Sequence, residues 1–391
     1  MKNTILILFF LSFLYTGCQY SLSGQYAYQP PEPMGDGLEV GTLADVNLDT
    51  TLIYTAVDRL LTGDLPGVHS MLIYKDGKLV LEEYFEGHKY QWDAPNHHGE
   101  RVQWDAGMDH HLMSATKSIT SACIGIAIDK GFIDHVQQSI FDYLPDHQHL
   151  KAGGKEQITI EDLLTMRAGL EWPEWSELYS SFDNPAIGIW VSDQEPIEFI
   201  LGKPIEHEPG THFTYSSGNM MVLGEIIRHS SGMTIDSFAN VYLAEPLDGA
   251  IGWPLQFDNG VYANNAVTTP RTMAKVGILF LQNGIWKGER LIAESWVQKS
   301  ATTHPGNEGI NVPGEDSGRI GYAYTWWTKD YSRRGQDLHM YTASGWGGQH
   351  YMVLPEANTV VVFTGENYLS KRPPFEIMRK YVVPALRKAI Y

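Results

Sequence analysis

The sequence of 391 residues has only two cysteines, Cys18 and Cys123. Cys18 lies in the N-terminal leader described below, and the remaining cysteine cannot form an internal disulfide by itself. Positive charge is also scarce, because 28 Lys and Arg stand against 46 Asp and Glu, for a net charge of −18, and no long basic run is present. Proteins that bind nucleic acid need a positive surface, so we expect no nucleic-acid partner.

Long hydrophobic runs are absent except at the N-terminus, where residues 5–15 follow a short basic start. The run is too short to span a bilayer, and it is typical of a secretory signal. With Thr16-Gly17-Cys18 it resembles a bacterial lipoprotein signal, in which cleavage falls before Cys18 and the thiol carries lipid. We predict a signal peptide over residues 1–17 and a lipid anchor in the cell envelope, with ordinary secretion as the alternative. Residues 18–41, rich in Gly, Pro, Ser, Tyr and Gln, predict a flexible tether.

In the rest of the chain, hydrophobic periodicity predicts strands at both ends and helices in the middle. Two alternating runs flank Asp76-Gly77, which is a strong hairpin signal. The expected strands are 68–74, 79–85, 322–328, 339–342, 349–354 and 359–364, and the expected helices are 50–61, 118–130, 160–166, 220–229, 270–281 and 375–390.

This order of elements predicts an α+β fold. The two ends most simply form one antiparallel sheet flanked by terminal helices, and the middle forms a mainly helical subdomain. We expect one domain over residues 42–391, with the α/β part at about 42–112 and 250–391 and the helical part at about 113–249. A cleft between the two parts is the expected place for a site.

Ser114 is the only serine followed by a lysine three positions later, Lys117. Residues three apart share a helix face, and Ser114 would sit in the first helical turn, where free N–H groups favour an anion. A serine hydroxyl needs a neighbouring base, and a lysine screened from water has a lowered pKa. The pattern alone is weak, since a solvated helix face explains it equally well.

Two further stretches strengthen this interpretation. The loop Pro209–Asn219 contains Tyr215, whose hydroxyl can relay a proton beside an ammonium group. The glycine-rich stretch Ser344–Gln349 begins a strand that can offer a backbone N–H to an oxyanion. Trp172 and Trp175 are candidate walls of a pocket, or else they cap the core.

These pieces, in this order, resemble the serine β-lactamase and penicillin-binding-protein superfamily over about residues 45–390. The chain is most similar to the class C-like branch that contains esterases and the 6-aminohexanoate-dimer hydrolase type. Supporting stretches are Asp162–Leu170, Glu208–Gly210 and Thr269–Ala274.

The resemblance implies a role for each motif. Ser114 would be the nucleophile, Lys117 its proton acceptor and Tyr215 the base or acid on the leaving group. The backbone N–H groups of Ser114 and Gln349 would form the oxyanion hole. Trp346-Gly347-Gly348 would stand in place of Lys-Thr-Gly.

Two departures from the family pattern bear on the substrate. Ser217 replaces the Asn of Tyr-x-Asn, and Trp346 replaces a lysine that would meet a substrate carboxylate. We therefore expect a serine hydrolase acting on a small-molecule ester or amide through an acyl-enzyme. The alternatives are a D,D-peptidase or β-lactamase, and a non-catalytic binding or sensor domain.

We expect no cofactor and no metal. The histidines that could suggest metal, in the pairs 97–98 and 110–111 and at 147 and 149, lie in polar stretches without an evident set of convergent ligands.

Overall fold

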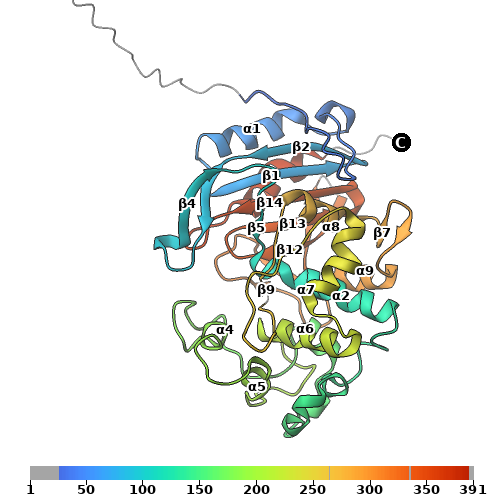
Figure 1. Cartoon of the computed structure of the whole chain (residues 1–391). Helices are drawn as coiled ribbons and strands as arrows, with labels where there is room; N and C mark the ends of the chain where they lie inside the picture. Colours follow the sequence, from blue (N-terminus) through green and yellow to red (C-terminus); the bar gives the residue numbers. More distant parts are fainter. Residues whose placement is uncertain (1–25, 264, 334–335, 387–391) are drawn as a thin grey trace, which may run out of the picture.

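The computed structural model describes residues 26–263, 265–333 and 336–386, and their centre is an eight-stranded antiparallel sheet (Figure 1). The strand order is β2-β1-β14-β13-β12-β11-β10-β9. Strand β1 pairs with β14, so the N-terminal hairpin joins the C-terminal strands, and the predicted sheet built from both chain ends is confirmed. The strands are β1 (Val68–Lys75), β2 (Lys78–Tyr84), β9 (Ile310–Asn311), β10 (Arg319–Tyr322), β11 (Trp327–Arg333), β12 (Gln336–Gly345), β13 (Gln349–Leu354) and β14 (Thr359–Gly365).

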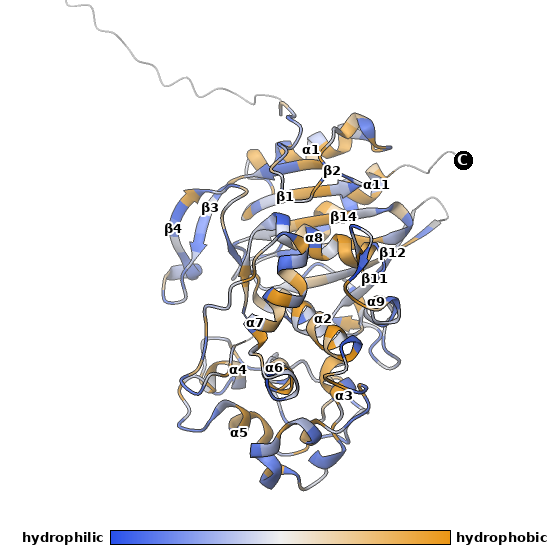
Figure 2. Ribbon diagram, turned by 45° about the vertical axis from the view of Figure 1, so that its right-hand side comes forward, coloured by the Kyte–Doolittle hydropathy of each residue, from blue (hydrophilic) through white to orange (hydrophobic). Residues whose placement is uncertain are grey.

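Each face of the sheet is covered by helices, as Figure 2 shows. One face packs on α1 (Thr50–Leu61) and on the C-terminal segments α10 (Pro374–Ile377), η10 (Met378–Val382) and α11 (Val383–Ala385). The other face packs on α2 (Thr116–Asp129) and α8 (Pro270–Leu281). Strand β1 serves both cores, because Met71 and Ile73 point to the first and Leu72 and Tyr74 to the second. The predicted α+β fold is therefore confirmed.

The helical part lies below the sheet in Figure 1 and is built on α2. Residues Thr116–Ala127 of α2 are buried, including Cys123, and the helix is followed by Gly131 with φ of 75°, as predicted. The other helices are α3 (Ile160–Leu164), α4 (Pro185–Gly188), α5 (Pro196–Leu201), α6 (Gly218–Ser231), α7 (Ile235–Ala239) and α9 (Glu294–Ala301), with a π-helical turn η7 (Asn240–Ala244). Short 3-10 turns are η1 (Leu43–Asp45), η2 (Pro95–His97), η3 (Met113–Ala115), η4 (Ile140–Tyr143), η5 (Pro145–Leu150), η6 (Lys155–Gln157), η8 (Glu245–Leu247) and η9 (Pro355–Ala357).

Two expected elements differ from the structure. The strand expected at 322–328 is interrupted between β10 and β11, where Thr325 has φ of 64° and its side chain donates to the Lys117 carbonyl. The backbone of this turn accepts hydrogen bonds from Ser118 and Ser121 of α2 instead of continuing the strand. The helix expected at 375–390 is present from Pro374 to Ala385, where α10, η10 and α11 follow one another without a gap. It differs from the expectation in the π-helical turn η10, which lies just before Pro384, a residue that lacks an N–H.

Three short pairs of strands in the described part of the chain were not predicted. The hairpin of β3 (Glu86–Tyr90) and β4 (His98–Gln103) lies in the aromatic and histidine-rich stretch. Strands β5 (His110–His111) and β6 (Val267–Thr268) pair next to Ser114, and β7 (Ile285–Trp286) pairs with β8 (Glu289–Arg290).

The predicted tether is wrong for residues 26–41. Tyr28 donates from its hydroxyl to the Val80 carbonyl, and the Tyr26 N–H donates to Asp58 in α1, so this segment lies on the domain. The predicted signal peptide and Cys18 fall outside the described residues. Within the described part of the chain, no helix combines the length and the apolar character needed to cross a membrane.

Candidate active site

Ser114 lies in η3, the 3-10 turn directly before α2. Met113 adopts a left-handed backbone with φ of 50°, a strained conformation of the kind that functional sites retain. The Tyr351 hydroxyl donates to the Ala115 carbonyl at 2.8 Å. Gly345 approaches so closely that a Cβ there would lie 2.1 Å from the Leu112 carbonyl oxygen. The central strands therefore hold the turn that presents Ser114.

Lys117 lies one helical step further along, on the same face as Ser114. Its Nζ is 3.1 Å from the Ser114 Oγ and 3.1 Å from the Ser217 Oγ, and its side chain is buried. Burial lowers the pKa of Lys117 to about 8, although the nearby Glu174 carboxylate acts in the opposite direction. An appreciable fraction of this amine is therefore unprotonated near neutral pH, as a base for Ser114 must be.

Tyr215 lies against the same pair. Its ring is 4.8 Å from the Lys117 Nζ and stacks on Trp175 with centroids 4.7 Å apart. Burial raises the pKa of Tyr215, while its hydrogen bond with Ser114 lowers it. The net effect is a phenol that stays protonated at neutral pH, so Tyr215 is suited to donate a proton and Lys117 to accept one. The predicted trio of Ser114, Lys117 and Tyr215 is brought together in the structure.

Glu174 completes the polar centre, and the sequence analysis missed it. It is 1% exposed, and it accepts a hydrogen bond from the Ser217 hydroxyl at 2.7 Å. In the sequence, the two aromatic rings of Trp172 and Trp175 indicate a pocket wall, but a single glutamate between them predicts no functional role. Lys117 contacts Ser217, and Ser217 in turn contacts Glu174. This connection cannot be predicted from the sequence, because it depends on the loop that carries Glu174 packing against the start of α6.

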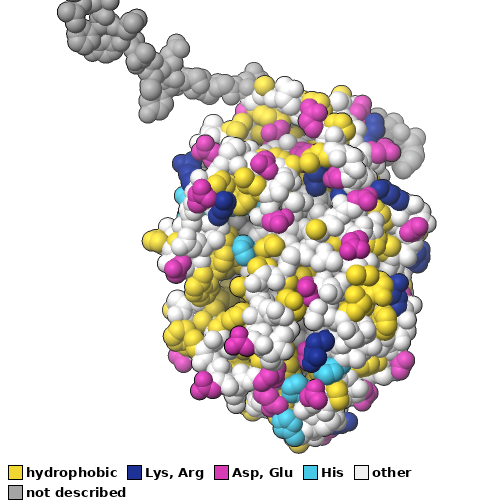
Figure 3. Space-filling model, viewed as in Figure 1, with side chains coloured by type: hydrophobic (Ala, Val, Ile, Leu, Met, Phe, Trp, Pro, Cys, Tyr) yellow, Lys and Arg dark blue, Asp and Glu magenta, His cyan; other side chains and the backbone are white. Residues whose placement is uncertain are grey.

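These residues open into a cleft of about 220 Å³ between the sheet and the helical part. Figure 3 shows hydrophobic side chains gathered around a hollow on this side, between the β3–β4 hairpin and α4. Among the predicted pocket residues, Trp346, Ser217 and Trp175 line the cleft. Trp172 is in the core instead, with its Nε1–H donating to Glu174 at 2.8 Å. The aromatic rings and apolar side chains that line the cleft include Tyr90, Trp92, Tyr179, Ile187, Trp190, Leu255 and Trp327.

This chain matches the family model described as Beta-lactamase over residues 55–374. The chain belongs to the Beta-lactamase family.

Relatives within and around the family differ in their named activities. The 6-aminohexanoate-dimer hydrolase of Paenarthrobacter ureafaciens is 25% identical over 272 residues, which make up 65% of this chain and 65% of that relative. A novel penicillin-binding protein homolog from Caulobacter crescentus has a TM-score of 0.63 at 16% identity, covering 86% of this chain and 96% of that chain. A family VIII carboxylesterase has a TM-score of 0.62 at 17% identity, covering 85% and 96%. At these identities the two structural matches establish the fold.

The expected position of the Lys-Thr-Gly element of the Beta-lactamase family needs correction. Gly347, Gly348 and Gln349 are not among the described residues that line the cleft, whereas Ser344, Gly345 and Trp346 are. The Gln349 Nε2 instead donates a hydrogen bond to the Gly365 carbonyl at 2.6 Å, and Gln349 lines a second cavity of about 290 Å³. The sequence misplaced this element because β12 ends at Gly345 and β13 begins at Gln349, so Gly347 and Gly348 form the turn that follows Trp346.

One cation, Arg372, is among the described residues that line the cleft. Arg372 donates from Nη1 to Glu315 at 2.7 Å, and the Glu315 side chain is only 2% exposed. Burial raises the pKa of Glu315, while the attraction of Arg372 lowers it. The pair therefore places a compensated charge in the cleft wall.

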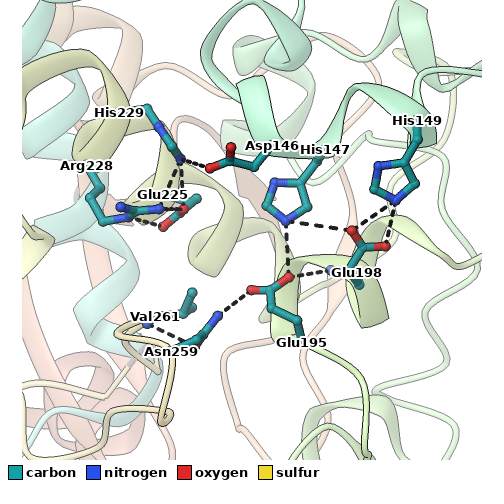
Figure 4. Close-up of polar contacts among 10 residues, drawn as sticks. All are labelled: Asp146, His147, His149, Glu195, Glu198, Glu225, Arg228, His229, Asn259 and Val261. Atoms are coloured by element: carbon teal, nitrogen blue, oxygen red, sulfur yellow. Dashed lines mark hydrogen bonds and ion pairs between the residues drawn. The ribbon is translucent and has the colours of Figure 1, made fainter.

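Two groups of side chains away from the cleft have the composition of metal ligands. The first contains His147, Glu195 and Glu198 (Figure 4), and the second contains His88, His98 and Glu366. The sequence analysis considered His147 and His98 but not His88, and it did not consider the carboxylates, which come from distant segments.

The contacts in both groups are hydrogen bonds. In the first, His147 Nε2 lies 3.1 Å from Glu195, whose carboxylate also caps the N-terminus of α5. In the second, the rings of His88 and His98 stack with their planes 5° apart, so their in-plane lone pairs do not converge. Hydrogen bonding and stacking explain both groups.

Proposed function

We propose that this protein is a serine hydrolase that cleaves an ester or amide through an acyl-enzyme on Ser114. The observation that carries the proposal is the 3.1 Å contact between the Ser114 Oγ and the buried Lys117 Nζ. In acylation, Oγ attacks the carbonyl carbon and its proton passes to Lys117. The leaving group then departs with a proton, supplied through Tyr215, and water releases the acyl group in the second half of the reaction.

The negative oxygen formed during attack needs donors close to Ser114. We assign this role to the backbone N–H groups of Ser114 and Trp346. Support comes from Gly345, where a Cβ would lie 3.2 Å from the Ala115 nitrogen. This end of β12 therefore borders η3, the turn that carries Ser114. Gln349, the donor expected from the sequence, lines the other cavity.

The cleft supports an uncharged substrate with apolar or amide character. Its walls are largely made of aromatic and aliphatic side chains, and its arginine is paired with Glu315. Removing a charged group from water is costly unless an unpaired opposite charge meets it. The names of the relatives, an aminohexanoate-dimer hydrolase and a carboxylesterase, are consistent with amide or ester cleavage.

We expect measurable hydrolysis of small p-nitrophenyl esters and low activity on β-lactams, which carry a carboxylate. The measurement is kcat/KM for p-nitrophenyl acetate and butyrate beside nitrocefin, with the same enzyme preparation. Efficient nitrocefin turnover without ester hydrolysis would favour the D,D-peptidase or β-lactamase alternative. The structural match to a penicillin-binding protein homolog is consistent with that alternative.

A non-catalytic sensor on the same scaffold is the second alternative. A sensor does not need a serine paired with a buried lysine of lowered pKa, and both are present. Labelling by a fluorophosphonate probe separates the two, because only an activated serine reacts rapidly with it.

We propose in addition that the protein is exported and anchored by lipid on Cys18. The support is the sequence alone: an apolar run that ends in Thr16-Gly17-Cys18. One acyl chain binds membranes only marginally, so more than one is expected. Globomycin should leave an unprocessed precursor in cells that express the protein, and Cys18→Ser should leave the same unprocessed precursor, because it removes the thiol that carries the lipid. Unchanged processing and location in both experiments would refute the anchor.

A further inference from the structure

Glu174 is surrounded by hydrogen-bond donors. Its Oε2 accepts from the Trp172 Nε1–H at 2.8 Å and from the Ser217 N–H at 2.7 Å. Its Oε1 accepts from the Tyr179 hydroxyl at 2.9 Å and from the Ser217 hydroxyl at 2.7 Å. The indole and backbone N–H groups can only donate, so Oε2 carries no proton. An ionised carboxylate is the state that accepts from all four donors.

This arrangement fixes the direction of the next hydrogen bond. The Ser217 hydroxyl has one proton, and that proton lies in the hydrogen bond that Ser217 donates to Glu174. Toward Lys117, 3.1 Å away, the Ser217 oxygen can then only accept. The neutral lysine amine donates one N–H to Ser217, and its lone pair is left to receive the proton of the Ser114 hydroxyl at 3.1 Å.

We propose that Glu174 is a positioning residue, which acts through Ser217 to aim the lone pair of Lys117 at Ser114. The proposal rests on the proposed function, because it concerns the base of that reaction. It also gives a reason for the serine at position 217, where the family motif has asparagine. Serine donates to Glu174 and accepts from Lys117 through a single oxygen.

The carboxylate has a second, electrostatic effect on the same base. Its negative charge raises the pKa of Lys117 and so opposes the effect of burial. Loss of this charge should lower the pKa of Lys117. The low-pH limb of the kcat/KM profile, which reports the free enzyme, should then move to lower pH.

Glu174→Gln tests the direction of the hydrogen bonds. The two N–H donors at Oε2 require an acceptor, so the amide oxygen takes that place and the amide NH2 faces Ser217 and Tyr179. Ser217 then accepts from the glutamine and turns its own proton toward the lone pair of Lys117. The base is occupied, and kcat/KM should fall by about 10- to 100-fold, by analogy with the loss found when groups that orient a metal ligand are removed.

The experiment measures kcat/KM from pH 5 to pH 10 for wild type, Glu174→Gln, Ser217→Ala and the double variant, with a p-nitrophenyl ester. Glu177→Gln is the matched control, because Glu177 is exposed in the same loop. We expect a loss in Glu174→Gln with its low-pH limb at lower pH, and a comparable loss in Ser217→Ala. The double variant should be little worse than Ser217→Ala, since the two residues form one chain of hydrogen bonds.

Wild-type activity in Glu174→Gln, or a loss with an unmoved low-pH limb and only a lower Tm, would overturn the positioning role. Additive losses in the double variant would also overturn it. Failure of the proposed function is a separate result, because it would leave Ser114→Ala fully active in the same assay. Ser217→Ala keeps the carboxylate buried with three donors, so it tests the relay even if Glu174→Gln does not fold.

Discussion

Ser114→Ala should abolish ester hydrolysis and covalent labelling together, with a loss of about 10⁴- to 10⁶-fold in kcat. The reason is that the Ser114 Oγ lines the cleft and contacts the Lys117 Nζ from η3, the turn directly before α2. The measurement is the steady-state rate with p-nitrophenyl butyrate and gel detection of a fluorophosphonate probe.

Two controls accompany this variant: loss of a hydroxyl at an exposed serine, and a test that Ser114→Ala is folded. Ser295→Ala removes a hydroxyl from an exposed position and should keep wild-type activity. Circular dichroism and Tm should show that Ser114→Ala is folded, which is expected because the change removes one atom from a partly exposed side chain. A folded Ser114→Ala protein that hydrolyses the ester at the wild-type rate would contradict the site assignment.

Lys117→Ala should cost nearly as much as Ser114→Ala, because a nucleophile and its base act as one unit. The Ser114→Ala, Lys117→Ala double variant should therefore be little worse than either single variant. Lys117→Arg should not restore activity, since a guanidinium stays protonated and cannot accept the proton. Lys151→Ala, at an exposed lysine, is the matched control.

The wild-type pH profile provides an independent check on this base. The pKa of Lys117 is lowered to about 8, and the reactive form is the neutral amine. Below this pKa, kcat/KM should fall about tenfold per pH unit, and above it the rate should level off. A profile that is flat from pH 6 to pH 9 would show that Lys117 is not the base, as would full activity in Lys117→Ala.

The sequence predicted the parts of the fold that depend on local periodicity and turn chemistry. Helix α1, the hairpin around Asp76-Gly77 and helix α8 were placed correctly, because amphipathic spacing, a turn dipeptide and a Thr-Pro start mark them. The break at Thr325 was not predictable in this way. It exists because the turn packs on α2, a contact across more than two hundred residues of sequence.

The same limit explains which site residues were found. Ser114 and Lys117 lie within one helical turn, and Tyr215 belongs to a recognisable motif, so sequence reasoning reached all three. Glu174 lies in a different loop from Ser217, and its role depends on their meeting in space. The position of Gln349 was wrong because one register shift in a glycine-rich turn exchanges the residues that face the cleft.

The central claim is that Ser114 carries the acyl group during turnover. The most direct measurement is to mix the wild-type enzyme with p-nitrophenyl butyrate, quench in acid during steady state, digest the protein and measure peptide masses. We predict the mass of one butyryl group on the peptide that contains Ser114, and none in Ser114→Ala. A butyryl group on another residue, or continued turnover in Ser114→Ala with an unmodified peptide, would contradict the account.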